Sequence, residues 1–417
     1  MSEYWKSSWP GEDGGPKRLQ TARNTVIPTI SADSQLDVTS RDAPALTMAI
    51  VGPNDELFLQ RIMPGPAAIS WVEKIDPITL EVIAQSEHLA GGPLWPGGLA
   101  AHANGSLYVV FGNHAHRLST DLQVIVSVEL PRLRPYNSFV ILPSGHLATK
   151  DFSGALPGQP NGTPMEPTEL LILDPQDLHI VARLELAEPS IARLSADEND
   201  IYIVGDYSLI RVFWRDETLI VDTTFNARYR TLVGQTFGWD AVITDEDAWF
   251  LDNGEGTQLF MGSFRGVGIS SAPLHLVRVN KKTAQVTLTE ICGLPDGIIA
   301  NPPVVDTQRQ IVVGFDSGNG VISGFDYDED SVTPRWSRQQ NHACHMLLLP
   351  EAGQIVTADH RPDLGCEQVV ILDITTGDEV ARVSTTSPIQ SAVFPAIGPK
   401  GDIYWCSMST ITRISVR

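Results

Sequence analysis

Residues 354–385, QIVTADHRPDLGCEQVVILDITTGDEVARVST, contain three short β-like runs separated by turn-forming residues. The first run, QIVTADH, follows another β-like segment that ends in the turn LPEAG (residues 349–353). The last two runs are joined by a Thr-Gly turn, which suits a tight connection between antiparallel strands. This part of the chain therefore predicts one four-stranded antiparallel sheet.

The same arrangement recurs along the whole chain. Helical periodicity is scarce, and short β-rich runs dominate. Seven further runs each follow a turn that contains Gly, Pro, Asn or Asp: ELFLQRI (56–62), SLYVVFG (106–112), HLATKDF (146–152), DIYIVGDY (200–207), AWFLDNG (248–254), QIVVGFD (310–316) and DIYWCSM (402–408). A four-stranded unit repeated roughly every 40–50 residues is typical of β-propeller blades, which must pack together to cover their apolar faces.

We therefore expect an all-β chain that forms a single β-propeller, with eight four-stranded antiparallel blades favoured and seven as the fallback. The last blade shows only three strands. A segment near residues 24–38 is expected to add its outer strand and to close the ring between the N- and C-terminal strands. Residues 1–24 are predicted as a polar N-terminal arm, and residues 25–417 as the propeller domain.

Charge and composition limit the classes of partner. The formal net charge is −21, from 29 basic and 50 acidic residues, so neither nucleic acid nor an anionic membrane is expected as a partner. No apolar stretch approaches the ~18 residues needed to span a bilayer, and the first twenty residues lack the apolar core of a signal peptide. We expect a cytoplasmic protein with a small-molecule substrate and free cysteines, whose oligomeric state the sequence leaves open.

Large or polar residues collect at the blade entrances, the positions immediately before each innermost strand. They are Trp95, Tyr136, Asn137, Arg193, Trp239, Asp240, Asn301, His342, His345 and Gln390. Packing between blades is the alternative explanation, above all for the tryptophans. Because functional residues of such rings gather at the channel mouth, we predict Arg193, Trp239 and Asn301 as substrate-binding residues, with Arg193 holding an anionic group.

Two insertions interrupt the blade rhythm on the same rim, at residues 153–169 and 254–273. The second contains Phe264 and other apolar residues among glycines, which favours a flap over an organic substrate. Phe264 is therefore added to the predicted substrate-binding residues. A loop that shields a neighbouring blade or forms a subunit contact is an equal alternative.

Histidines cluster near one blade entrance. His342, His345 and His360 are predicted as catalytic residues, because imidazole titrates near neutrality. Together with carboxylates, the same imidazoles suit a divalent metal ion of unknown identity. Ordinary loop histidines are the alternative, since no HExxH or paired CxxC motif is present.

Two resemblances to known families rest on short motifs. ILDITTGDEVAR (371–382) and KIDPITLEVIAQ (74–85) resemble the repeats of quinoprotein propellers. That family would imply pyrroloquinoline quinone, export and a vicinal cysteine pair; the chain shows neither an export signal nor adjacent cysteines, so this quinone is not expected.

YNSFVILPSGHLATKDF (136–152) is similar to a pattern of the gluconolactonase and regucalcin hydrolases. That resemblance implies a divalent cation held by Asn137 and Asp151 at the channel mouth. The predicted metal ligands are therefore Asn137, Asp151, His342, His345 and Asp359. Those hydrolases usually have six blades, and a match to their metal-binding Glu is missing.

The combined expectation is an enzyme that acts at the channel mouth on a small organic molecule with a carbonyl, ester or lactone group. Metal-assisted or histidine acid–base chemistry of a hydrolase or lactonase type would drive the reaction. The alternative is a non-catalytic propeller that binds a protein partner through its rim. A redox enzyme with an exogenous quinone is a more distant alternative.

Overall fold

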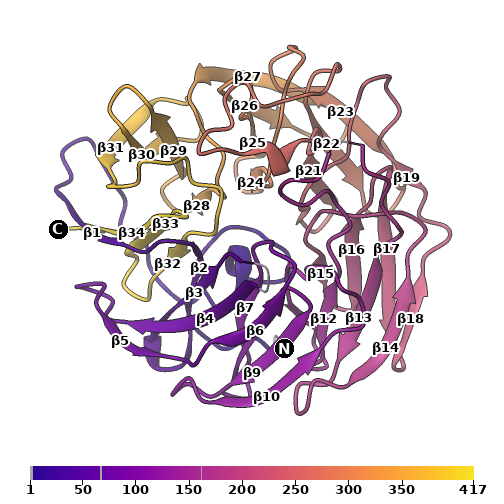
Figure 1. Cartoon of the computed structure of the whole chain (residues 1–417). Helices are drawn as coiled ribbons and strands as arrows, with labels where there is room; N and C mark the ends of the chain where they lie inside the picture. The colour runs from indigo at the N-terminus through magenta and orange to yellow at the C-terminus, as the bar shows by residue number, and fades with distance from the viewer. Residues whose placement is uncertain (1–2, 66–67, 161) are drawn as a thin grey trace.

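The computed structural model describes residues 3–65, 68–160 and 162–417. Eight antiparallel sheets are arranged as a ring around a central channel, as Figure 1 shows. The prediction of an all-β propeller with eight blades is confirmed. Among the described residues, no helix is long and apolar enough to cross a membrane.

The blades are numbered here in chain order, and each blade's strands are given from the channel outwards. Blade 1 contains β2 (Leu46–Val51), β3 (Leu57–Met63), β4 (Ala68–Ile75) and β5 (Val82–Gln85), and blade 2 contains β7 (Gly98–Ala101), β8 (Leu107–Phe111), β9 (His114–Leu118) and β10 (Val124–Glu129). Blade 3 contains β11 (Val140–Ile141), β12 (Leu147–Lys150), β13 (Glu169–Leu173) and β14 (Ile180–Glu185), and blade 4 contains β15 (Ser195–Asp197), β16 (Asp200–Val204), β17 (Ser208–Arg215) and β18 (Thr218–Val221).

Blade 5 contains β20 (Val242–Ile243), β21 (Asp247–Leu251), β22 (His275–Asn280) and β23 (Val286–Glu290), and blade 6 contains β24 (Val304–Asp306), β25 (Ile311–Asp316), β26 (Val321–Tyr327) and β27 (Val332–Gln339). Blade 7 contains β28 (Leu347–Leu349), β29 (Gln354–Arg361), β30 (Cys366–Asp373) and β31 (Glu379–Ser384), and blade 8 contains β32 (Ala396–Ile397), β33 (Ile403–Cys406), β34 (Thr410–Val416) and β1 (Leu36–Asp42). The additional elements are β6 (Leu89–Gly92), β19 (Ala227–Arg228) and the short 3₁₀ turns η1 (Glu12–Gly14), η2 (Pro53–Asp55) and η3 (Thr257–Leu259).

Burial falls from the channel to the outside of each blade. All six residues of β2 are buried, whereas every residue of β14 and β31 is half-buried or exposed. An inner strand is covered on both faces by the neighbouring blades, so it tolerates a continuous apolar run. The core is consequently divided into clusters between adjacent blades.

The ring closes between the two ends of the propeller, as predicted. β1 pairs with β34 over its whole length, from Leu36 opposite Val416 to Asp42 opposite Thr410. Closure begins at Leu36, later than the start of the predicted segment, because residues 25–34 take other partners. Thr25, for example, donates a hydrogen bond to the carbonyl of Pro399.

The segment predicted as a polar arm lies against the innermost strands. We call residues 3–24 the N-terminal segment; Figure 1 shows it in indigo near the centre of the ring. Backbone hydrogen bonds connect it to five blades: Trp5 with Ala101, Trp9 with Val51, Pro16 with Ala196, Lys17 with Ile243, and Gln20 with Leu348. Although this segment is polar, Glu12, Asp13 and Arg18 are at most 5% exposed.

Candidate functional site

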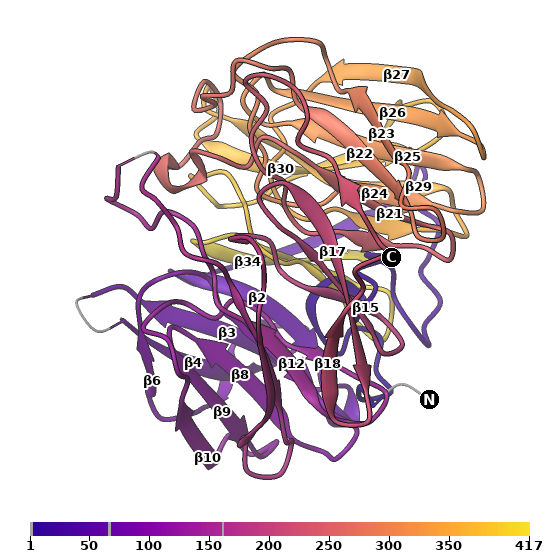
Figure 2. The ribbon, with the colours of Figure 1, turned by 90° about the vertical axis from the view of Figure 1, so that its right-hand side faces the viewer.

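The long loops mark one end of the channel. Figure 2 shows the loop around η3 projecting from one side of the ring. A cavity of about 360 Å³ lies at the loop side, between the blade entrances and residues 254–273. Its wall is mainly aromatic and aliphatic, and includes Trp95, Trp239, Phe260, Met261, Phe264 and Phe394.

Stacked aromatic rings form part of this wall. Trp95 stacks on Phe152 with ring centroids 4.3 Å apart, and on Trp239 at 6.2 Å. A Cβ atom at Gly254 would lie 2.5 Å from Nε1 of Trp239, so a glycine is required where the loop passes the indole. The wall is therefore fixed by packing between blade entrances and the start of the loop.

The flap over the cavity is attached to the entrance of blade 8. The backbone N–H of Phe264 donates to Oε1 of Gln390 at 2.7 Å, and the backbone N–H of Gln390 donates to Gly262 O at 2.9 Å. Phe264 is 1% exposed and stacks on Phe260, whereas Met261 is 92% exposed. The flap thus has a fixed side and an exposed tip.

A second cavity, of about 450 Å³, shares the Trp95 and Trp239 wall. It is more polar, because Asp206, Arg230 and Glu255 line it. Burial raises the pKa of Asp206 to about 7, although Arg230 acts in the opposite direction. Oδ1 of Asp206 is buried and has no hydrogen-bonding partner among the described residues. This carboxyl can therefore exchange a proton near neutral pH.

Buried ionic groups lie where η1 meets residues of the blade entrances. Arg18 donates to Oε2 of Glu12 at 2.8 Å and to Oδ2 of Asp13 at 2.9 Å. Arg193 lies 3.3 Å from the same Glu12 oxygen. Asp13 has a φ of 51°, a left-handed conformation that Asp adopts more readily than most residues. The N-terminal segment is thereby held by charge pairs inside the ring.

Arg193 lines the first cavity, but most of its N–H groups bind the protein itself. It donates to the backbone carbonyls of Gly97, Pro96 and Asn137. Burial lowers the pKa of Arg193, with Glu12 acting in the opposite direction. Arg193 therefore joins three loop carbonyls to the N-terminal segment, and few of its donors remain for a ligand.

The structure brings the four predicted substrate-binding residues together. Arg193, Trp239, Phe264 and Asn301 all line the cavity of about 360 Å³. The Nδ2 of Asn301 donates to the carbonyl of Ala343, so this side chain also fixes the entrance of blade 7. Their role in binding remains a prediction, but their shared position is a finding.

The three predicted catalytic histidines do not line this cavity. Nδ1 of His342 accepts the backbone N–H of Ala358 at 3.0 Å, and burial lowers the pKa of His342 to about 3. Nε2 of His360 lies 3.3 Å from the carbonyl of Pro388. His345 is buried, with its ring centroid 3.8 Å from that of Phe394.

The five predicted metal ligands are not brought into one cluster. Asp151 pairs with Arg134 at 3.0 Å, and Asp359 with Arg382 at 2.9 Å. Nδ2 of Asn137 donates to the carbonyl of Ile191 at 3.2 Å. Of the predicted set, only His345 belongs to a group of His, Cys, Asp or Glu with ligand atoms in mutual reach among the described residues.

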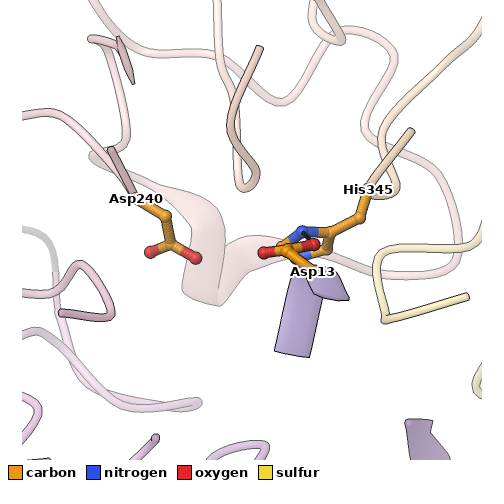
Figure 3. A group of neighbouring side chains, drawn as sticks. All are labelled: Asp13, Asp240 and His345. Carbon is orange, nitrogen blue, oxygen red and sulfur yellow. Dashed lines mark ion pairs between the residues drawn. The ribbon is translucent and has the colours of Figure 1, made fainter. Parts of the chain in front are cut away.

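Two such groups exist in the described part of the chain. In the first, Asp13, Asp240 and His345 are buried, and Figure 3 shows their side chains facing a common space. The second, Asp174, Asp177 and His179, lies at the surface turn between β13 and β14. The chain thus has carboxylate–histidine clusters that are compatible with a metal ion, whose identity they do not define.

Sequence reasoning missed several residues of this region. Asp13 belongs to a Gly-rich polar segment with no motif, and Phe394 carries no sequence signal beyond hydrophobicity. Asp206 was also missed, although Asp recurs near the ends of the second strands of five blades, a pattern that the sequence shows. Trp95 and Asp240 were visible as entrance residues without a defined role.

No protein-family model and no curated protein matches the chain. The fold is similar to that of quinohemoprotein alcohol dehydrogenase from Comamonas testosteroni, with a TM-score of 0.68 and 10% identity over 98% of this chain and 80% of that chain. A europium-containing methanol dehydrogenase gives 0.62 and 9%, covering 96% and 89%. BamB from Moraxella catarrhalis gives 0.57 and 13%, covering 89% and 99%.

These similarities confirm the quinoprotein-like propeller architecture that the repeats indicated. A likeness to the gluconolactonase group is not shown, and the eight blades depart from the six that are usual there. At such low identities the comparisons establish the fold and no activity.

Proposed function

We propose that the channel mouth binds a small, largely apolar organic molecule that contains a ring or another flat group. The observation that carries this proposal is the aromatic cavity of about 360 Å³ between the Trp95–Trp239 stack and the flap residue Phe264. Its volume lies at the lower end of the range for small-molecule sites. The expected ligand is therefore about the size of one substituted ring.

The polar end of this ligand would extend into the neighbouring cavity. Both cavities share Trp95 and Trp239, so a ring against the indoles can carry a substituent towards Asp206 and Arg230. The Asp206 carboxyl, with a pKa of about 7, offers an exchangeable proton, and the Arg230 guanidinium offers a fixed positive charge. A ring with a carbonyl, ester or lactone group fits this combination.

Catalysis is a second candidate function, and Asp206 is the observation that favours it. A general acid or base works best when its pKa lies near the working pH, and that of Asp206 is raised to about 7. Under this proposal Asp206, rather than the predicted histidines, would move a proton during hydrolysis. Its rate would change around pH 7, and Asp206→Asn would remove both the change and most of the activity.

The binding proposal is tested with a panel of substituted aromatic acids, esters and lactones, using tryptophan fluorescence and thermal shift. Trp95→Leu should weaken the affinity of any ligand found by at least about 10-fold, because the ring loses its stacking surface. Trp71→Leu is the matched control, since Trp71 is also half-buried but lies in β4, outside the cavity. Equal affinities in the two variants would contradict the proposal.

A further inference from the structure

Three polar side chains from distant parts of the chain meet in the channel. Asp13 comes from η1, while Asp240 and His345 come from the entrances of blades 5 and 7. One ligand atom from each lies within 4.8 Å of the other two. Three donors bound to one ion at about 2.0–2.2 Å would lie at most about 4.4 Å apart, so only small adjustments are needed.

Each carboxylate in this group has one oxygen engaged and one oxygen directed to the shared space. Oδ2 of Asp13 accepts from Arg18, and Oδ1 of Asp240 accepts the backbone N–H of Arg193 at 2.6 Å. This leaves Oδ1 of Asp13, beside His345, and Oδ2 of Asp240. A metal site has the same organisation, in which outer hydrogen bonds orient the ligating atoms.

Unsatisfied atoms in this group favour a bound ligand. Oδ2 of Asp240 has no hydrogen-bonding partner among the described residues, and neither ring nitrogen of His345 makes a hydrogen bond there. Nδ1 of His345 lies 2.8 Å from Oδ1 of Asp13, which makes an ion pair when the imidazole is protonated. All three residues are at most 2% exposed, and buried polar groups without partners are costly.

The surrounding charges favour a cation. Within the channel, the carboxylates of Glu12, Asp13 and Asp240 face two guanidinium groups, from Arg18 and Arg193. This leaves one negative charge while His345 is neutral. A protonated His345 or the nearby ammonium of Lys150 is the competing source of positive charge. Two carboxylate oxygens and one imidazole nitrogen are donors that suit Mn²⁺, Fe²⁺, Co²⁺ or Zn²⁺.

We propose that Asp13, Asp240 and His345 bind one divalent transition-metal ion inside the channel. None of these three residues lines the proposed ligand cavity, and the site does not depend on it. Because Asp13 belongs to the N-terminal segment, the ion would join this segment to blades 5 and 7. Binding would therefore raise the stability of the folded ring.

The test starts from the full chain carrying Asp177→Asn and His179→Gln, which removes the exposed second cluster. This double variant is the parent of the variants below. The protein is refolded from denaturant with Mn²⁺, Co²⁺ or Zn²⁺, and dialysed, and its metal content is measured by elemental mass spectrometry. We expect about one ion per chain and a higher melting temperature than in the metal-free protein. Asp240→Asn and His345→Gln should each weaken binding by at least about 10-fold.

The control variant is Asp245→Asn, which makes the same charge change at an exposed position five residues away. It should bind metal as the parent does. The Co²⁺ form of the parent gives a second readout. Ligation by oxygen and nitrogen alone produces no thiolate charge-transfer band, whereas ligation by Cys344, which adjoins His345 in sequence, would produce one. This spectrum remains decisive where a variant fails to fold.

Three results would overturn the proposal. The first is a parent protein that takes up none of the three ions on refolding. The second is metal retained equally by Asp240→Asn and His345→Gln, and the third is a thiolate band in the Co²⁺ spectrum. Binding seen only before the surface cluster is removed would assign the metal to Asp174, Asp177 and His179 instead.

Discussion

The guanidinium carbon of Arg193 lies 4.4 Å from the ring centroid of Phe394. The imidazole of His345 also packs on Phe394. The phenyl ring therefore contacts both Arg193 and His345. Arg193 and Phe394 line the apolar cavity, whereas His345 does not. Arg193 and Phe394 therefore connect the wall of the cavity to the buried ionic groups around Glu12 and His345.

Replacing Arg193 by Met should destabilise the ring by about 3–5 kcal/mol, because Glu12 and three backbone carbonyls would lose a buried cationic partner. Urea unfolding followed by fluorescence measures this change. Arg215→Met is the control, since Arg215 pairs with Asp200 at the surface and should cost no more than about 1 kcal/mol. Similar losses in both variants would show that Arg193 does not organise the channel.

Trp9→Ala should cost about 3–5 kcal/mol in the free energy of unfolding, as for other large buried aromatic residues. Trp9 is 1% exposed and packs with residues of blades 1, 7 and 8, so the loss should appear in global unfolding. Trp5 lies in the same segment but is only half-buried, and Trp5→Ala should cost clearly less. An N-terminal segment that unfolds separately, without a change in the global midpoint, would contradict this expectation.

The propeller could be predicted because the sequence patterns that specify its strands and turns are local and recur in every blade. Turns such as LPEAG and the Thr-Gly turn at Thr376 occur where a hairpin needs them, and the apolar runs between them fit strands buried on both faces. Ring closure was also readable, since a three-stranded last blade requires an outer strand from elsewhere. Only its start was misplaced, because residues 25–34 resemble a strand in composition.

The channel interior could not be predicted in the same way. Asp13 is 332 positions from His345, and its burial depends on Arg18 and on the whole ring. Conversely, Asp151 was predicted as a ligand from the resemblance to the gluconolactonase group, and Asp359 from its place beside His360. In the structure, Arg134 and Arg382 pair with these two carboxylates. A single sequence shows which side chains carry charge, whereas their partners depend on tertiary geometry.

Gln390→Ala should loosen the flap, because it removes the side-chain acceptor of the Phe264 N–H, while the backbone donor to Gly262 O remains. Loss of a hydrogen bond worth about 1–1.5 kcal/mol should raise the rate of tryptic cleavage after the exposed Arg265 by about 10-fold. The exposed Gln123 provides the control variant Gln123→Ala. Unchanged cleavage after Arg265 would show that other contacts hold the flap.

His116 should make the stability of the ring depend on pH. It is 1% exposed in β9, where Nε2 bonds to the carbonyl of Ala90 and Nδ1 lies 2.9 Å from Oγ of Ser127. Burial lowers the pKa of His116 to about 4 from its ordinary value of 6.5. Between pH 6.5 and about 4, His116 therefore binds a proton in the unfolded chain but not in the folded chain.

As a result, His116 contributes stability that is fully present above pH 6.5 and is lost as the pH falls towards about 4. The greatest slope from this one group is about 1.4 kcal/mol per pH unit, and the total loss about 3 kcal/mol. Urea unfolding at several pH values should show a smaller slope for His116→Gln than for the parent. His88→Gln, at an exposed position, should leave the slope unchanged, and an equal slope in all three proteins would contradict the assignment to His116.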